Sequence, residues 1–115
     1  MPRVDSGTLY GTLNLLILRT LEAGSCHGLD VARKIGQISS DVLNVEEGAL
    51  YPALHRLERD GLVAAEWGVS ENNRRARFYS LTSRGEAKLA AETRTWVRHA
   101  KAVSRVLGVA GQLAE

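Results

Sequence analysis

The spacing of apolar residues predicts a helix near the start of the chain. Over residues 9–23, one apolar stripe recurs every three or four positions, comprising Leu9, Leu13, Leu16, Ile17 and Leu21. Leu15 and Leu18 widen this stripe, so we expect a central helix that its neighbours bury on most sides. Gly24 follows directly and supplies a stop.

Two further helices are predicted over residues 27–38 and 46–60. In the first, the residues expected to face inward are Leu29, Val31, Ala32, Ile35 and Ile38. In the second, Leu50, Leu54 and Leu57 recur on one side, and Gly61 follows the last turn as a left-handed stop.

The start of the third helix carries two conflicting signals. Asn44 and Glu47 have the spacing of a capping box, in which each side chain bonds the other residue's backbone. Pro52 removes one backbone donor and crowds the carbonyl of Gly48. We therefore expect the ordered helix to start late or to bend at Pro52.

Residues 62–67 and 76–81 read as two short strands of a hairpin, because Gly, Ser and Asn residues fill the segment between them. A long helix is predicted next, over residues 83–111, where Thr82 or Ser83 offers the N-cap and Ser83 with Glu86 has the capping-box spacing. Along it runs an a/d heptad of Leu89, Thr93, Trp96, Ala100, Val103, Leu107 and Ala110.

Three helices followed by a hairpin give the element order of a winged helix-turn-helix. The predicted fold class is thus mainly α with a small β-hairpin, plus a long C-terminal dimerisation helix. We place a DNA-binding domain at residues 9–82 and the dimerisation helix at residues 83–115.

Charge is distributed unevenly along the 115 residues, whose net charge is +2. Residues 1–73 carry a balance of −4, and residues 74–115 a balance of +6. Such asymmetry favours an anionic partner such as nucleic acid, although a solvated basic helix face would give the same numbers.

The candidate DNA-binding side chains lie on the third helix and at the end of the hairpin loop. They are long or planar groups able to reach phosphates or base edges: Tyr51, His55, Arg56, Arg59, Arg74, Arg75 and Arg77. Arginine forks match phosphate geometry, and a hairpin tip can enter the minor groove. The alternatives are a solvated helix face and a charged strand edge that resists aggregation.

At these residues the chain resembles the PadR family of transcriptional regulators. The resemblance rests on EEGALYPALHRLERDGLV at residues 46–63, supported by LNLLILRTL, AEWG and NNRRARFYSLTSRG. It implies a winged helix-turn-helix of the short form, homodimerisation through the last helix, and repression of nearby genes. It also implies that Tyr51, His55 and Arg56 lie on the recognition helix and Arg74, Arg75 and Arg77 on the wing.

The heptad of the last helix predicts a homodimer, with Leu89, Trp96, Val103 and Leu107 at its interface. Burying the largest of these side chains against a second copy is worth roughly 1.5–3 kcal/mol each. A twofold dimer presents two recognition helices about 34–36 Å apart, so we expect an inverted-repeat operator in double-stranded DNA.

Trp96 lies in the middle of this seam between the small residues Thr93 and Ala100. Two such indoles near the twofold axis could line a flat slot for a small planar hydrophobic or aromatic effector. Some short PadR-like multidrug sensors are similar at this place. The alternative is a packed dimer core.

Other classes of function find little support in the residues. No metal-ligand pattern, cofactor motif or catalytic constellation is present, so an enzyme is not expected. The single cysteine, Cys26, and the absence of a signal-peptide pattern or long apolar run favour a cytoplasmic protein with no membrane partner. A winged-helix module that binds protein without DNA remains the competing interpretation.

Overall fold

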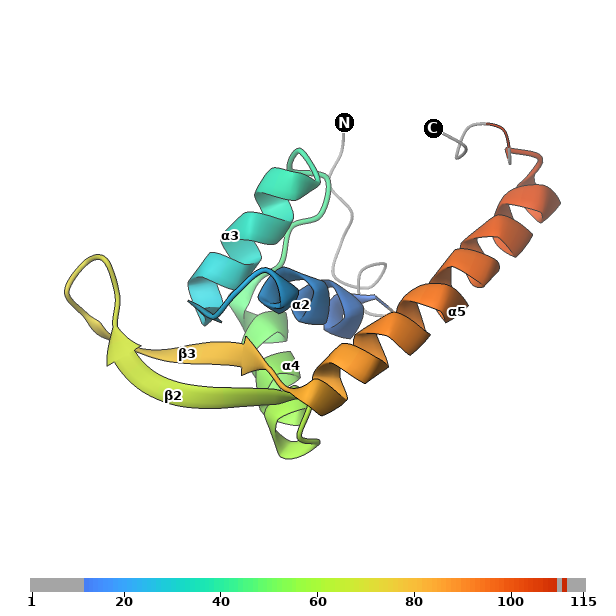
Figure 1. Cartoon of the computed structure of the whole chain (residues 1–115). Helices are drawn as coiled ribbons and strands as arrows, with labels where there is room; N and C mark the ends of the chain where they lie inside the picture. The colour runs from blue at the N-terminus through green and yellow to red at the C-terminus, as the bar shows by residue number, and fades with distance from the viewer. Residues whose placement is uncertain (1–11, 110, 112–115) are drawn as a thin grey trace.

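Four helices and a small antiparallel sheet make up residues 12–109 and 111, which the computed structural model describes. The elements in chain order are α2 (Leu13–Glu22), β1 (Cys26–His27), α3 (Gly28–Ile38), α4 (Glu47–Arg59), β2 (Val63–Val69), β3 (Arg75–Leu81) and α5 (Ser83–Leu107). Figure 1 shows α2, α3 and α4 packed together, with the β2–β3 hairpin and α5 leading away from them. The predicted stripe residue Leu9 and the heptad residue Ala110 lie outside the described residues.

The core forms where α2 packs against α3 and α4. α2 buries Leu13, Ile17, Leu18 and Leu21 in it, which confirms a helix covered on most sides. The side of α4 predicted to face inward is also confirmed, since Leu50, Leu54 and Leu57 are at most 2% exposed.

The inward face predicted for α3 is partly wrong. Val31 and Ile35 are buried, but Leu29 is 50% exposed and Ile38 is 81% exposed. Leu29 lies about half a turn around the helix from Val31 and Ile35, because successive residues advance by about 100°. Ile38 is the last residue of α3, and the core ends before it.

The ends of α4 differ from the prediction at the start and agree with it at the finish. Glu46 is the N-cap, so the capping box predicted for Asn44 and Glu47 is not formed. The helix begins five residues before Pro52 and therefore does not start late. Gly61 has a φ of +75°, and the N–H of Leu62 donates to the carbonyl of Leu57 at 2.9 Å, which makes the expected left-handed stop.

The sheet has the order β1-β3-β2, and both pairings are antiparallel. β2 pairs with β3 along its whole length, from Val63 opposite Leu81 to Val69 opposite Arg75. The two-residue strand β1 was not predicted, because a pair of residues shows no periodicity. It corrects the start of the second helix: His27 is the N-cap of α3, and its Nδ1 accepts from the N–H of Asp30 at 3.3 Å.

The start of α5 is tied closely to the end of α4. Thr82, rather than Ser83, is the N-cap. The capping box predicted for Ser83 with Glu86 is therefore wrong, because the helix begins one residue earlier than that pairing requires. The Thr82 hydroxyl accepts from the N–H of Gly85 at 3.0 Å, and it lies 2.8 Å from the carbonyl oxygen of Gly61. These bonds fix the direction in which α5 leaves the hairpin.

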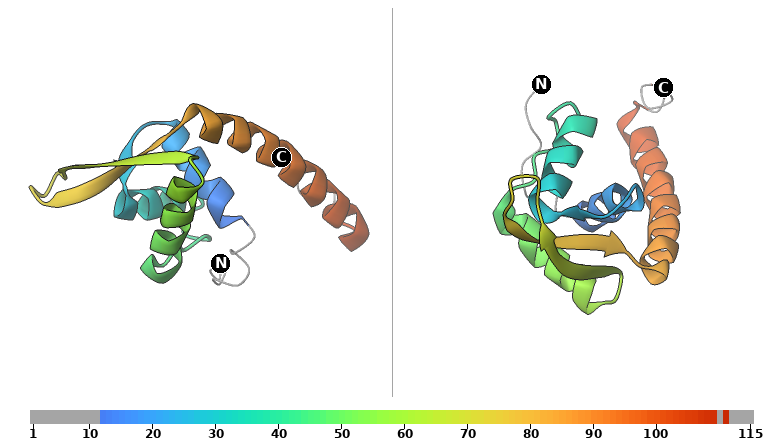
Figure 2. Two further views of the ribbon diagram at one scale, coloured as in Figure 1. Left: turned by 90° about the horizontal axis from the view of Figure 1, so that it is seen from below. Right: turned by 60° about the vertical axis from the view of Figure 1, so that its left-hand side comes forward.

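From that junction α5 runs for 25 residues, about 37 Å by helical rise. It ends at Leu107, four residues earlier than predicted, because Gly108 takes a left-handed conformation with a φ of +77°. Figure 2 shows that α5 and the hairpin extend in opposite directions from the packed helices. Among the described residues, no helix combines the length and apolar character that crossing a membrane requires.

Gly85 is the position where the fold leaves no space for a side chain. A Cβ there would lie 2.0 Å from the backbone carbonyl oxygen of Leu62. We predict that Gly85→Ala lowers the free energy of unfolding by about 1–3 kcal/mol, measured by urea denaturation, because the backbone must shift to relieve the overlap. Gly48→Ala is the matched control, since a Cβ there meets nothing within 4 Å. That control should stabilise the helix by about 0.5–1 kcal/mol, and equal effects of the two substitutions would contradict the packing described.

Candidate nucleic-acid interface

The polar side of α4 carries the four helix residues predicted to contact DNA. His55, Arg56 and Arg59 are exposed, and Tyr51 is half-buried. The guanidinium of Arg59 forms an exposed ion pair with its neighbour Asp60 at 3.4 Å. Because the opposite side of α4 is locked into the core, these side chains project from a rigid element.

Tyr51 is held at the contact between α4 and α3. A Cβ on Gly28 would lie 2.9 Å from the Tyr51 ring, so glycine at position 28 lets the ring approach the start of α3. Burial raises the pKa of the Tyr51 phenol, and the carboxylate of Glu47 adds to this shift. Tyr51 therefore offers a neutral hydroxyl at neutral pH.

One face of the β2–β3 hairpin, called the wing below, carries arginine and aromatic side chains, whereas Glu66 and Phe78 lie on the other face. Alternation along the strands places Trp67, Arg75, Arg77 and Tyr79 on the same side, with Trp67 directly opposite Arg77 in the register. At the tip, the Ser70 hydroxyl accepts from the N–H of Arg74 at 3.3 Å and helps to order the turn.

Arg75 is stacked over Trp67 at the outer part of the wing. Its guanidinium carbon lies 4.4 Å from the centre of the Trp67 ring, within the range of a cation–π interaction. Trp67 is nevertheless 58% exposed, and Arg75 is exposed as well. The stack thus presents a positive charge with a restricted orientation to the surroundings.

Arg77, predicted to contact DNA, already pairs with an acidic residue of its own chain in this structure. Its Nη2 lies 2.9 Å from Oε2 of Glu58 on α4, and its Nη1 lies 3.3 Å from Oε1. Both side chains are 32% exposed. Both terminal nitrogens of the Arg77 guanidinium are therefore paired within the chain, because the side chain reaches from β3 to the last turn of α4.

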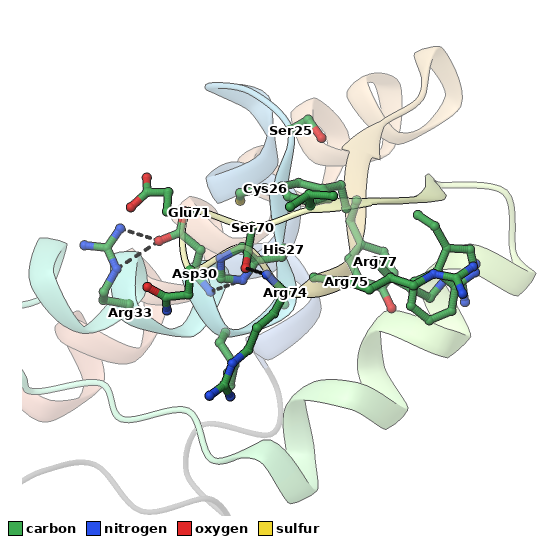
Figure 3. A pocket seen from close by; sticks show the side chains of 18 of the residues that line it. Ser25, Cys26, His27, Asp30, Arg33, Ser70, Glu71, Arg74, Arg75 and Arg77 are labelled. Carbon is green, nitrogen blue, oxygen red and sulfur yellow. Dashed lines mark hydrogen bonds and ion pairs between the residues drawn. The ribbon is translucent and has the colours of Figure 1, made fainter.

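The wing, α4 and the start of α3 border one cleft of about 1010 Å³. Figure 3 shows Arg75 and Arg77 at one side of it, Asp30 with Arg33 at the other, and Arg74 between them beside Ser70. Tyr51 and His55 also line this cleft, whereas Arg56 and Arg59 are not among its lining residues. The structure therefore brings together five of the seven residues predicted for DNA binding.

The start of α3 contributes residues that sequence reasoning did not include in the site. Burial alone would raise the pKa of Asp30, but the hydrogen bond and charge of Arg33, with the charge of Lys34, hold it below its ordinary value. The ring of His27 meets the edge of Phe78 on β3 with 5.7 Å between centroids. No motif marks these residues in the sequence, since they come together only through the pairing of β1 with β3.

The apolar face of α5 is divided between the core and the surface. Leu89 is 4% exposed and belongs to the core of its own chain, so little of it remains for the predicted dimer contact. Trp96, Val103 and Leu107 are 46%, 41% and 68% exposed. Thr93 is exposed and Ala100 is half-buried, and both lie on α5 with Trp96, on a different element from those that border the cleft.

Most of the positive charge that follows residue 73 lies on α5 rather than on the wing. The wing carries Arg74, Arg75 and Arg77, whereas α5 carries Arg84, Lys88, Arg94, Arg98, Lys101 and Arg105. Since Glu58 neutralises Arg77, the asymmetry of charge along the chain is a weaker indication of DNA binding by the wing than the sequence suggested.

Three helices with a wing, followed by a long helix, define a winged-helix protein with a C-terminal helical extension. Solved structures share this arrangement. A transcriptional regulator from Clostridium thermocellum superposes with a TM-score of 0.79 at 24% identity, covering 89% of this chain and 96% of the other. A PadR-like transcription factor from Bacteroides fragilis superposes with a TM-score of 0.69 at 30% identity, covering 88% and 95%.

The sequence comparisons identify the family. The profile described as "Transcriptional regulator PadR-like family" matches residues 17–91. The transcriptional regulator Rv3488 of Mycobacterium tuberculosis is 41% identical over 58 residues, which are 50% of this chain and 53% of that protein. The chain belongs to the PadR-like family of transcriptional regulators, whose members are not enzymes.

Proposed function

We propose that this protein is a transcriptional repressor that binds double-stranded DNA as a homodimer. The observation that carries the proposal is the placement of Arg74 and Arg75 on the wing beside the exposed side of α4, at one cleft. A rigid helix with an arginine-bearing hairpin next to it suits a duplex, since the helix can enter the major groove while the hairpin contacts the backbone.

Within this proposal the residues have different tasks. Arg74 and Arg75 bind phosphates, because both are exposed and guanidinium groups match phosphate geometry. Tyr51, His55 and Arg56 contact base edges or phosphates from α4, and Arg59 lies at the edge of the contact. Arg77 is removed from the direct contacts because Glu58 already binds its fork.

The dimer is proposed to form along α5. Trp96, Val103 and Leu107 recur with spacings of seven and four, which keeps them on one side of the helix, and all three expose apolar surface. Covering them with a second copy removes that surface from water and places two DNA-binding units, residues 9–82, around a twofold axis formed by residues 83–115. The proposed target is then an inverted-repeat operator in double-stranded DNA, bound by a cytoplasmic protein.

The competing function, a winged-helix module that binds protein alone, is favoured by the acidic residues near the site. Glu58 and Asp60 pair with Arg77 and Arg59 and reduce the positive charge of the α4 side. The two functions differ in their dependence on salt, because a DNA complex releases counterions and weakens steeply as salt increases.

The wing arginines provide the first test. We predict that Arg74→Ala and Arg75→Ala each weaken binding to a promoter duplex and to a scrambled duplex alike, because a phosphate contact carries no sequence information. In fluorescence anisotropy titrations, each should reduce the slope of log affinity against log salt by about 1.

Arg98→Ala, at an exposed arginine on α5, is the matched control and should leave both the affinity and the slope unchanged. Absence of binding by the wild-type protein, or binding that does not respond to salt, would support the protein-binding alternative instead.

A charge on the apolar row of α5 tests the dimer. We predict that Val103→Asp converts the protein to a monomer, because one aspartate from each chain would be buried at the interface without a partner. Light scattering after size exclusion should report twice the 12.5 kDa chain mass for the wild type and one chain mass for the variant. Ala102→Asp introduces the same charge about 100° around the helix and should remain dimeric. Wild-type protein of a single chain mass would refute the dimer.

We further propose that Trp96, flanked by Thr93 and Ala100, takes part in a slot for a small planar aromatic effector. The exposed indole beside small neighbours supports this, and a packed dimer core is the alternative. An effector can release DNA only if it binds the two dimer shapes with different affinities.

We predict that a planar aromatic dye quenches Trp96 fluorescence, measured in a Trp67→Phe background, and lowers the DNA affinity of the protein that retains Trp67. Trp96→Ala should abolish the dye's effect on DNA binding while light scattering still reports a dimer. Equal dye binding and equal loss of DNA affinity in the Trp96→Ala variant would show that the slot is not the effector site.

A further inference from the structure

The ion pair of Glu58 with Arg77 stands apart from the others in the structure. Among the described residues, every other ion pair joins residues at most four apart in the sequence. Arg77 and Glu58 are 19 residues apart and join the wing to α4 through two hydrogen bonds. Ion pairs between exposed neighbours in the sequence contribute little to stability. An ion pair with two hydrogen bonds between two elements restricts the orientation of one element relative to the other.

The surroundings of Arg77 restrict it further. Its guanidinium carbon lies 5.8 Å from the Trp67 ring centre and 5.9 Å from that of Tyr79, which is buried at 2% exposure. Its Nε is buried and has no hydrogen-bond partner within the described residues. Arg77 is therefore half-buried between two aromatic rings of the wing, and its ion pair in this structure is with Glu58.

The chain of contacts continues from Arg77 to the outer wing. Trp67 is the direct register partner of Arg77, and Arg75 stacks on the same indole at 4.4 Å. Glu58, Arg77, Trp67 and Arg75 thus form a continuous series from the last turns of α4 to the exposed arginine. One ion pair and two ring contacts thus connect Glu58 to Arg75.

We propose that Glu58 is the positioning residue of the wing: through Arg77 and Trp67 it sets the orientation in which Arg75 is presented beside α4. This inference rests on the proposed DNA binding and assigns Arg77 to the wing's internal support. For the change in DNA affinity when the Glu58 carboxylate is removed, it predicts the opposite sign from simple electrostatics. Removing a carboxylate near DNA should strengthen binding if only charge matters, whereas loss of the positioning contact weakens binding to the operator.

The experiment compares Glu58→Gln with Glu66→Gln. Glu66 is exposed on the other face of β2, so its substitution removes the same charge from the wing without touching Arg77. Affinities for an operator duplex and for a scrambled duplex are measured at one salt concentration. Because Arg75 is proposed to contact phosphate, we expect Glu58→Gln to lose roughly threefold to tenfold in affinity for both duplexes, and Glu66→Gln to lose none.

Hydrogen exchange of the free protein supplies a readout that does not depend on DNA. Glu58→Gln should speed amide exchange in β2 and β3 while leaving α2 unchanged, and Glu66→Gln should not. The charge-swapped double variant Glu58→Arg with Arg77→Glu should restore slow exchange, because the pair forms again in reverse. Recovery of slow exchange in the double variant would show that the Glu58→Gln effect comes from loss of the ion pair and not from a general loss of stability.

Equal or higher operator affinity for Glu58→Gln, or unchanged exchange in the wing, would overturn the inference. If the wild-type protein binds neither duplex, the proposed function fails and the presentation of Arg75 to DNA fails with it. The exchange data would still decide whether Glu58 orders the wing, so the two failures can be told apart.

Discussion

Burial of the inner side of α4 is the constraint on which the rest of the structure depends. Leu50 and Leu54 are fully buried against the core that α2 organises. Removing either side chain to alanine would cost about 2–5 kcal/mol, so the helix cannot rotate about its axis without a comparable loss. The polar side of α4 is thereby fixed outward, and the wing, which follows directly after Gly61, is placed beside it. The candidate interface is a consequence of where the leucines must go.

Local patterns were sufficient to predict the elements that form this arrangement. The spacing of leucines located α2, α4 and α5, and Gly61 marked the end of α4, because periodicity and a left-handed stop are properties of neighbouring residues. The hairpin followed from its turn residues. In the site, exposure of His55, Arg56 and the wing residues Arg74 and Arg75 also followed from local alternation.

What the sequence did not predict depends on partners distant along the chain. Strand β1 exists only because Cys26 and His27 pair with β3. Leu89 occupies an a/d heptad position, but the core of its own chain covers it first. Arg77 is one of three clustered arginines, yet only its position opposite Trp67 brings it to Glu58. In each of these cases the local sequence is compatible both with the predicted role and with the observed one. Contacts with residues distant along the chain decide which role the structure has.

A titration of isotope-labelled protein with a duplex from its own promoter region, followed by amide NMR shifts, tests the central claim most directly. We expect the largest shifts to fall together on the exposed side of α4, at Tyr51 and His55, and on the wing at Arg74 and Arg75. Signals from the exposed side of α5 around Arg98 should stay in place. Shifts confined to α5, or no shifts at any ratio of duplex to protein, would contradict a duplex held between α4 and the wing.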